Sequence, residues 1–178
     1  PPVAVPDEIA ARPHTRLEIP VVRNDVDPDG DDISIEPITK GWDPHAEIDG
    51  QRVIVQTPAE RGAYQFYYRI TDGGGAPVTG VVTVTVDENV PPAKPIALDD
   101  YVPTDSIAGL AEVEVPVLVN DSDPDGARDA LTVSADAPAR VNGANVMVPL
   151  ADDRQIVLYT ITDSDGLSAR AAVVVPGK

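Results

Sequence analysis

An internal repeat divides the chain into two copies of one pattern. Residues 20–30 and 116–126 both read Pro-Val-x-x-Asn-Asp-x-Asp-Pro-Asp-Gly. Two further blocks recur in the same order: residues 2–7 as 95–100, and residues 68–72 as 159–163. Three matched blocks in one order indicate tandem copies of one structural unit. We therefore expect two domains, residues 1–89 and 90–178, joined by a short, stiff linker that contains Pro91, Pro92 and Pro95.

Apolar and polar residues alternate within each copy. Val82, Val84 and Val86, for example, alternate with Thr83 and Thr85. Runs of period two that are broken by Gly, Pro, Asp and Asn are typical of short strands. The pattern predicts about seven strands in each copy, and so an all-β fold of two tandem seven-stranded Greek-key sandwiches. They are expected near residues 3–5, 16–22, 32–38, 46–49, 52–56, 63–71 and 79–86, and again near 96–98, 112–119, 130–135, 139–142, 145–149, 156–162 and 168–175.

Charge and composition exclude several classes of function. The net charge is -17, which disfavours nucleic acids and anionic membranes as partners and favours a monomer. There is no Cys, only two His residues, and no motif that marks a nucleophile. We therefore expect no enzyme activity. Because the chain begins at Pro1 without a signal peptide, we interpret it as a piece of a longer protein.

The repeated acidic block is the candidate for metal chemistry. Asp25, Asp27 and Asp29 precede Gly30, and Asp121, Asp123 and Asp125 precede Gly126. Alternate carboxylates on a tight loop suit calcium, which takes six to eight oxygen ligands. The competing interpretation is structural, because Asp-Pro-Asp-Gly is also typical of a type I turn.

The expected topology gathers more acidic residues around these loops. In a Greek-key sandwich, the start of the first strand and the loops after the second and sixth strands lie at one pole. Carboxylates concentrated there would repel one another unless a cation lay among them. Residues 87–89 are expected to approach the pole of the second copy, where a cation would fix the junction. The candidate calcium ligands are Asp7, Asn24, Asp25, Asp27, Asp29, Asp72, Asp87, Asp99, Asp100, Asn120, Asp121, Asp123, Asp125 and Asp163.

Trp42 is the single tryptophan, and the second copy has no equivalent. An exposed Trp at this loop could bind a sugar or a protein partner. The favoured interpretation is that it caps the open end of the core of its own domain.

Three blocks together resemble a known family. The Asn-Asp-x-Asp-Pro-Asp-Gly block, the Pro-x-Ala-x-x-Asp opening and the Tyr-x-Ile-Thr-Asp block are similar to bacterial immunoglobulin-like and cadherin-like repeats. The resemblance implies tandem immunoglobulin-like domains in an extracellular or cell-surface adhesin-like protein, where they act as spacers with calcium near the junctions. Their partners would be neighbouring repeats. The alternative is an adhesion module that binds a carbohydrate or a protein. In the second copy, Arg128 stands where it could take the place of a cation.

Overall fold

The computed structural model describes residues 1–36 and 45–178, in two compact units, Pro1–Pro92 and Ala93–Lys178. The predicted boundary after residue 89 lies just before the division between the units. Among the described residues, no helix is long and apolar enough to cross a membrane.

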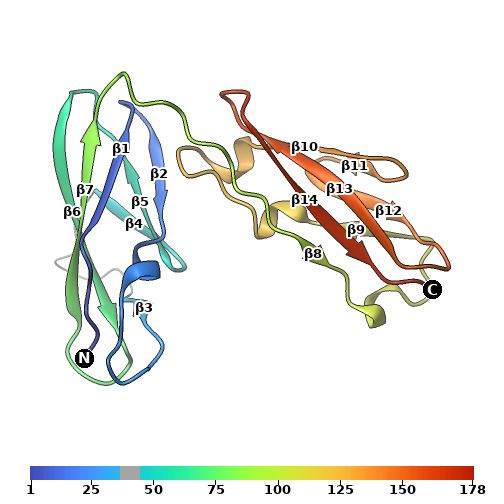
Figure 1. Cartoon of the computed structure of the whole chain (residues 1–178), viewed down its shortest axis with the longest axis horizontal. Coiled ribbons are helices and arrows are strands. Elements are labelled where there is room, and N and C mark those ends of the chain that lie inside the picture. The colour runs from blue at the N-terminus through green and yellow to red at the C-terminus, as the bar shows by residue number, and fades with distance from the viewer. Residues whose placement is uncertain (37–44) are drawn as a thin grey trace. The chain divides into compact units, whose positions relative to one another are not determined.

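The first unit is a sandwich of two sheets (Figure 1). A four-stranded sheet has the order β1-β7-β6-β3, and a three-stranded sheet has the order β2-β5-β4. The strands are β1 (Asp7–Ala11), β2 (Arg16–Ile19), β3 (Ser34–Ile35), β4 (Ala46–Asp49), β5 (Arg52–Gln56), β6 (Gly62–Thr71) and β7 (Val78–Val86).

The second unit repeats this arrangement. Its four-stranded sheet has the order β10-β13-β14-β8, and its three-stranded sheet has the order β11-β12-β9. The strands are β8 (Asp100–Tyr101), β9 (Glu112–Val115), β10 (Thr132–Ala135), β11 (Arg140–Asn142), β12 (Asn145–Pro149), β13 (Gln155–Thr162) and β14 (Ser168–Val175). The all-β prediction of two tandem sandwiches is thereby confirmed.

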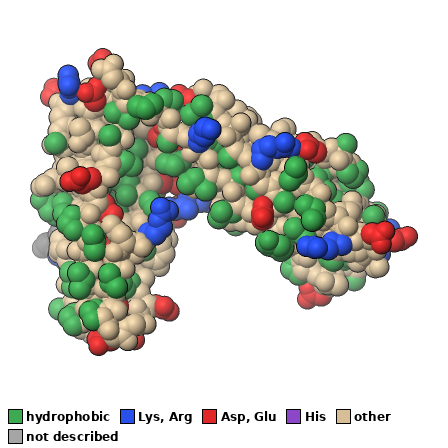
Figure 2. Space-filling view, viewed as in Figure 1, with side chains coloured by type: hydrophobic (Ala, Val, Ile, Leu, Met, Phe, Trp, Pro, Cys, Tyr) green, Lys and Arg blue, Asp and Glu red, His purple; other side chains and the backbone are tan. Residues whose placement is uncertain are grey.

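Each core is built from the inward-facing residues of alternating strands. Val82, Val84 and Val86 are fully buried in the first unit, and Val173 and Val175 are fully buried in the second. The Thr residues between the first three point away from the core, because successive side chains of a strand face opposite sides of the sheet. On the face in view in Figure 2, acidic side chains form small separate groups with apolar side chains between them.

The first and last strands of each unit pair in parallel. In the first unit, Asp7–Ala11 lie opposite Val82–Val86 in five residue pairs. In the second unit, only Asp100 and Tyr101 pair with β14.

The predicted first strands, residues 3–5 and 96–98, are wrong in position. Val3 and Ile96 form only isolated bridges, to Val26 and Ser122, and the sheet pairing begins at Asp7 and Asp100. The second strand of each copy is also shorter than predicted. Because a proline cannot donate a backbone hydrogen bond to a ladder, the strands end before Pro20 and Pro116. A 3-10 helix follows each of them, η1 (Val21–Asn24) and η3 (Val117–Val119).

Candidate metal centre

The acidic residues at one end of each unit separate into two groups. The 3-10 helix after Pro20 or Pro116 leads into the repeated Asp block, and successive aspartates of the block take different directions. In each unit the first aspartate of the block meets a buried tyrosine. The second meets the aspartate that follows the long sixth strand.

Asp123, Asp125 and Asp163 form the outer group of the second unit. One carboxylate oxygen from each of the three lies within 4.8 Å of the other two. Asp123 and Asp163 are only 3% and 7% exposed, so two carboxylates of this cluster are removed from water. Three carboxylates at such separations form an oxygen-rich cluster that suits a hard divalent cation.

One oxygen of Asp163 is fixed by the turn between β13 and β14, and the other has no hydrogen-bond partner. Its Oδ1 accepts hydrogen bonds from the backbone N–H groups of Asp165, at 2.9 Å, and Leu167, at 2.8 Å. Its Oδ2 is buried and accepts none. A buried carboxylate oxygen without a partner is costly, and a cation between the three carboxylates would remove that cost. The residues present therefore fit a bound calcium ion.

The proton affinity of Asp123 reflects the same crowding. Burial, followed by a hydrogen bond with Asp125 and the charges of Asp125 and Asp163, raises the pKa of Asp123 to about 7. Gly126 leaves room for this arrangement, because a Cβ at that position would force the Asp123 carboxylate to shift.

The corresponding group of the first unit is Asp27, Asp31 and Asp72, whose oxygens also lie within 4.8 Å of one another. All three are more exposed than Asp123 and Asp163. The backbone N–H of Gly74 donates to Asp72 at 2.9 Å and is the largest influence that lowers the pKa of Asp72. Asp31 was not among the predicted ligands. Its position directly after the Gly30 turn, beside the acidic block, was the only signal that could have found it.

The inner group links the start of each unit to its core. In the second unit, the Tyr159 hydroxyl lies 2.8 Å from Asp121 Oδ2, and the Leu98 N–H donates to Asp121 Oδ1 at 2.8 Å. Asp121 is fully buried, and burial is the largest influence that raises its pKa. Asp100 lies nearby, where burial and then the charge of Asp121 raise its pKa to about 6.

The first unit repeats this inner group with its own residues. The Tyr68 hydroxyl donates to Asp7 Oδ2 at 3.1 Å and lies 3.5 Å from Asp25 Oδ2. The Val5 N–H donates to Asp25 Oδ1 at 2.8 Å. Burial is the largest influence that raises the pKa values of Asp7 and Asp25. Because protein donors already satisfy much of these carboxylates, the inner groups tie strands together.

The other predicted ligands lie outside the outer groups. Asn24 Nδ2 donates to Asp7, and Asn120 Nδ2 donates to the carbonyl oxygen of Asp99. Asp29 is exposed, Asp99 accepts the Ala172 N–H, and Asp87 forms an ion pair with Arg61 at 3.1 Å. Arg128 donates to the carbonyl oxygen of Asp121 at 2.8 Å. The predicted partner-binding residue, Trp42, lies outside the described residues.

Comparisons with known proteins bear on the whole chain. The sequence model of the family described as bacterial Ig domain matches residues 1–85 and again 91–176. The comparison with curated proteins found no match.

Several solved structures are similar to the chain at low identity. The human desmocollin-1 ectodomain is 15% identical with a TM-score of 0.35, and the match covers 99% of this chain and 36% of that one. Immunoglobulin domains 1–4 of sidekick-1 are 12% identical with a TM-score of 0.41, covering 96% and 49%. An endo-fucoidan hydrolase of glycoside hydrolase family 107 is 15% identical with a TM-score of 0.35, covering 98% and 34%. The chain thus spans less than half of each of these structures, and at these TM-scores the likenesses carry no argument about function.

Proposed function

Because the chain belongs to the bacterial immunoglobulin domain family, which both of its copies match in turn, we propose that it is a calcium-binding spacer segment of a bacterial surface or secreted protein. Its role is structural and not catalytic. Two small sandwiches in tandem, joined by a linker with three prolines, set a distance between whatever precedes and follows them.

The single observation that carries the calcium proposal is the buried Asp163 Oδ2. This oxygen has no hydrogen-bond partner, and its carboxylate lies close to those of Asp123 and Asp125. We assign the cation to this outer group of the second unit. The more exposed group of Asp27, Asp31 and Asp72 is proposed as a weaker site. Affinities of about 10⁻⁴ to 10⁻³ M would suffice outside a cell, where calcium is abundant.

A contact of Asp125 supports a link between the cation and the linker. Asp125 Oδ2 accepts the backbone N–H of Ala93 at 2.8 Å, and Ala93 immediately follows Pro91 and Pro92. A cation that orders the Asp125 carboxylate would therefore also order the point where the linker enters the second unit. Calcium would stiffen the junction without being required for either fold.

Isothermal titration calorimetry with calcium, and with magnesium as the control, tests the site. We expect saturable calcium binding that is lost in Asp123→Ala and kept in Asp27→Ala, the matched change in the first unit. The stiffening is tested separately by small-angle X-ray scattering. Addition of chelator should broaden the distribution of distances between the units, and identical profiles with and without chelator would refute the stiffening even if calcium binds.

A further inference from the structure

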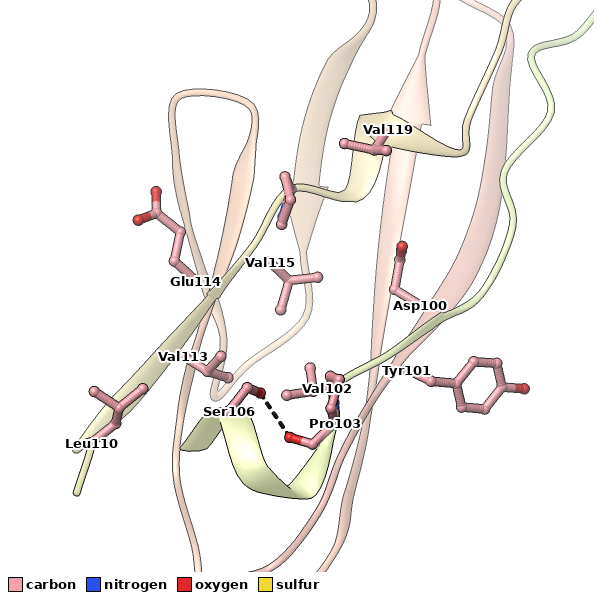
Figure 3. Close-up of a pocket in the computed structure, with 11 residues that line it drawn as sticks. Asp100, Tyr101, Val102, Pro103, Ser106, Leu110, Val113, Glu114, Val115 and Val119 are labelled. Atoms are coloured by element: carbon pink, nitrogen blue, oxygen red, sulfur yellow. Dashed lines mark hydrogen bonds between the residues drawn. The ribbon is translucent and has the colours of Figure 1, made fainter. Parts of the chain in front are cut away.

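The second unit has a groove beside an unpaired sheet edge (Figure 3). The groove has a volume of about 480 Å³. One side is formed by β8 and the 3-10 helix η2 (Thr104–Ile107), and the other side by β9. Its apolar lining includes Val102, Val113, Val115, Pro116 and Val119.

The edge of β9 leaves backbone groups available in this groove. In the sheet order β11-β12-β9, β9 pairs only with β12, from Val115 opposite Val146 to Glu112 opposite Pro149. Among the described residues, no strand pairs with its other edge. Such an edge presents a row of N–H and C=O groups to which an extended chain can add as a further strand.

Two carboxylates of the groove lack a cationic partner within the described chain. Asp100 Oδ2 is buried and accepts no hydrogen bond. In Figure 3 the side chain of Asp100 lies between β8 and the side chain of Val119. The exposed Glu114 meets only amide groups, those of Asn145 at 2.9 Å and Asn142 at 3.5 Å.

The first unit satisfies the corresponding carboxylates by itself. Asp7, the counterpart of Asp100, accepts hydrogen bonds at both oxygens, from Asn24 and Tyr68. Glu18, the counterpart of Glu114, is 6% exposed and pairs with Arg16 at 2.7 Å and Arg52 at 3.2 Å. The repeat therefore supplies an internal comparison for Glu114: its counterpart Glu18 pairs with two arginines, whereas Glu114 meets no cation among the described residues.

We propose that this groove binds an extended segment of another protein in which apolar side chains alternate with Lys or Arg. The segment adds to the free edge of β9 by backbone hydrogen bonds. Its apolar side chains pack on Val113, Val115 and Val119, and its cationic groups, on the opposite face of the added strand, pair with Glu114. Aliphatic stems that end in a charged group match a groove with an apolar wall and an acidic rim.

A second copy of the chain fits the groove poorly. Pairing two β9 edges would bring Glu114 of one copy close to Glu114 of the other, and like charges on adjacent strands are destabilising. The net charge of -17 adds to that repulsion. The partner is instead a basic and apolar strand, and this surface is separate from the proposed calcium site.

Nuclear magnetic resonance titration of the whole chain tests the proposal. The probe is an acetylated and amidated hexapeptide in which Val and Lys alternate. We expect saturable shifts concentrated at the amides of residues 112–115, both with calcium and with chelator. Glu114→Lys should weaken binding about tenfold or more, because it replaces a charge-assisted contact by repulsion. Glu114→Gln should weaken it severalfold while keeping the side-chain shape.

Two controls separate a specific groove from general charge attraction. Glu60→Lys makes the same charge change on the first unit and should leave the affinity within about twofold, since an exposed charge outside the groove contributes little. A hexapeptide in which Val and Glu alternate should not bind. The proposal is overturned if shifts stay linear and scattered, if Glu60→Lys weakens binding as much as Glu114→Lys, or if the acidic peptide binds equally well.

Discussion

Replacing Asp163 by Asn should change the stability of the second unit in opposite directions with and without calcium. Asn keeps an oxygen that can accept the N–H groups of Asp165 and Leu167. It also removes one of three carboxylates that lie within 4.8 Å of one another. In chelator, we therefore expect Asp163→Asn to raise the free energy of unfolding by about 1–2 kcal/mol. This is the size of the repulsion between the Asp163 carboxylate and its two neighbours, reduced by solvent screening.

With calcium the order should reverse. A site with a dissociation constant of about 0.1 mM, in 10 mM calcium, stabilises the wild type by about 2.7 kcal/mol. For a domain of this size that corresponds to a rise in Tm of roughly 11–22 °C. Asp163→Asn should lose most of this gain, because the variant lacks one of the charged ligands.

Hydrogen exchange at the buried amides of Val173 and Val175 measures the second unit by itself. Each protein is compared in 10 mM calcium and in chelator, at pH 8, with Asp72→Asn in the first unit as the matched control. The control should leave the protection of Val173 and Val175 unchanged. If Asp163→Asn lowers the protection equally in both conditions, Asp163 serves only the turn, and the reasoning from its unpartnered oxygen is refuted.

Three further predictions concern stability without calcium. Because the pKa of Asp123 is raised to about 7 in the fold, its contribution to the free energy of unfolding is complete below pH 3.8 and is lost as the pH rises through 7. Urea denaturation should show that the free energy of unfolding of the second unit falls by about 2 kcal/mol over this range, after allowance for screening. A rise in that free energy over the same range would contradict the raised pKa of Asp123. Tyr159→Phe removes the hydroxyl that contacts the fully buried Asp121 and should lower the free energy of unfolding by about 1.5–3 kcal/mol. Tyr68→Phe should lower it less, because Asp7 and Asp25, the acceptors of the Tyr68 hydroxyl, are partly exposed. Equal losses of stability in urea denaturation would contradict this explanation. Gly80→Ala would place a methyl group against the ring of Tyr68 and should cost about 1–3 kcal/mol by overpacking, and an unchanged urea midpoint would show that the ring can move aside.

Much of the fold follows from the sequence because it depends on short-range patterns. Because Val82, Val84 and Val86 alternate with threonine, only one face of this strand is apolar, and that face must turn toward the core. The repeated blocks predict the same unit twice, and the family match confirms the resemblance to bacterial immunoglobulin-like repeats. The first strands were misplaced, because residues 3–5 and 96–98 look like strands but form single bridges, and the second strands end earlier than expected, before Pro20 and Pro116.

The candidate site was predictable as a region and not as a set of ligands. The topology brought the acidic block close to Asp72 and Asp163, as expected. Sequence alone could not tell that Asp25 and Asp121 would meet the hydroxyls of Tyr68 and Tyr159. Which aspartate faces the core depends on the 3-10 helix that follows the proline, and no periodicity reports that local geometry. The calcium ligands therefore stay a prediction, narrowed in the second unit to Asp123, Asp125 and Asp163.

The parallel pairing of first and last strands has a mechanical consequence for a spacer. When a domain is pulled from both ends, two parallel terminal strands are sheared lengthwise, so their hydrogen bonds resist the force together. The first unit engages five residue pairs between β1 and β7, and the second unit engages two between β8 and β14. Under tension the second unit should therefore unfold at the lower force. Calcium bound near its linker would then set the force at which the segment lengthens.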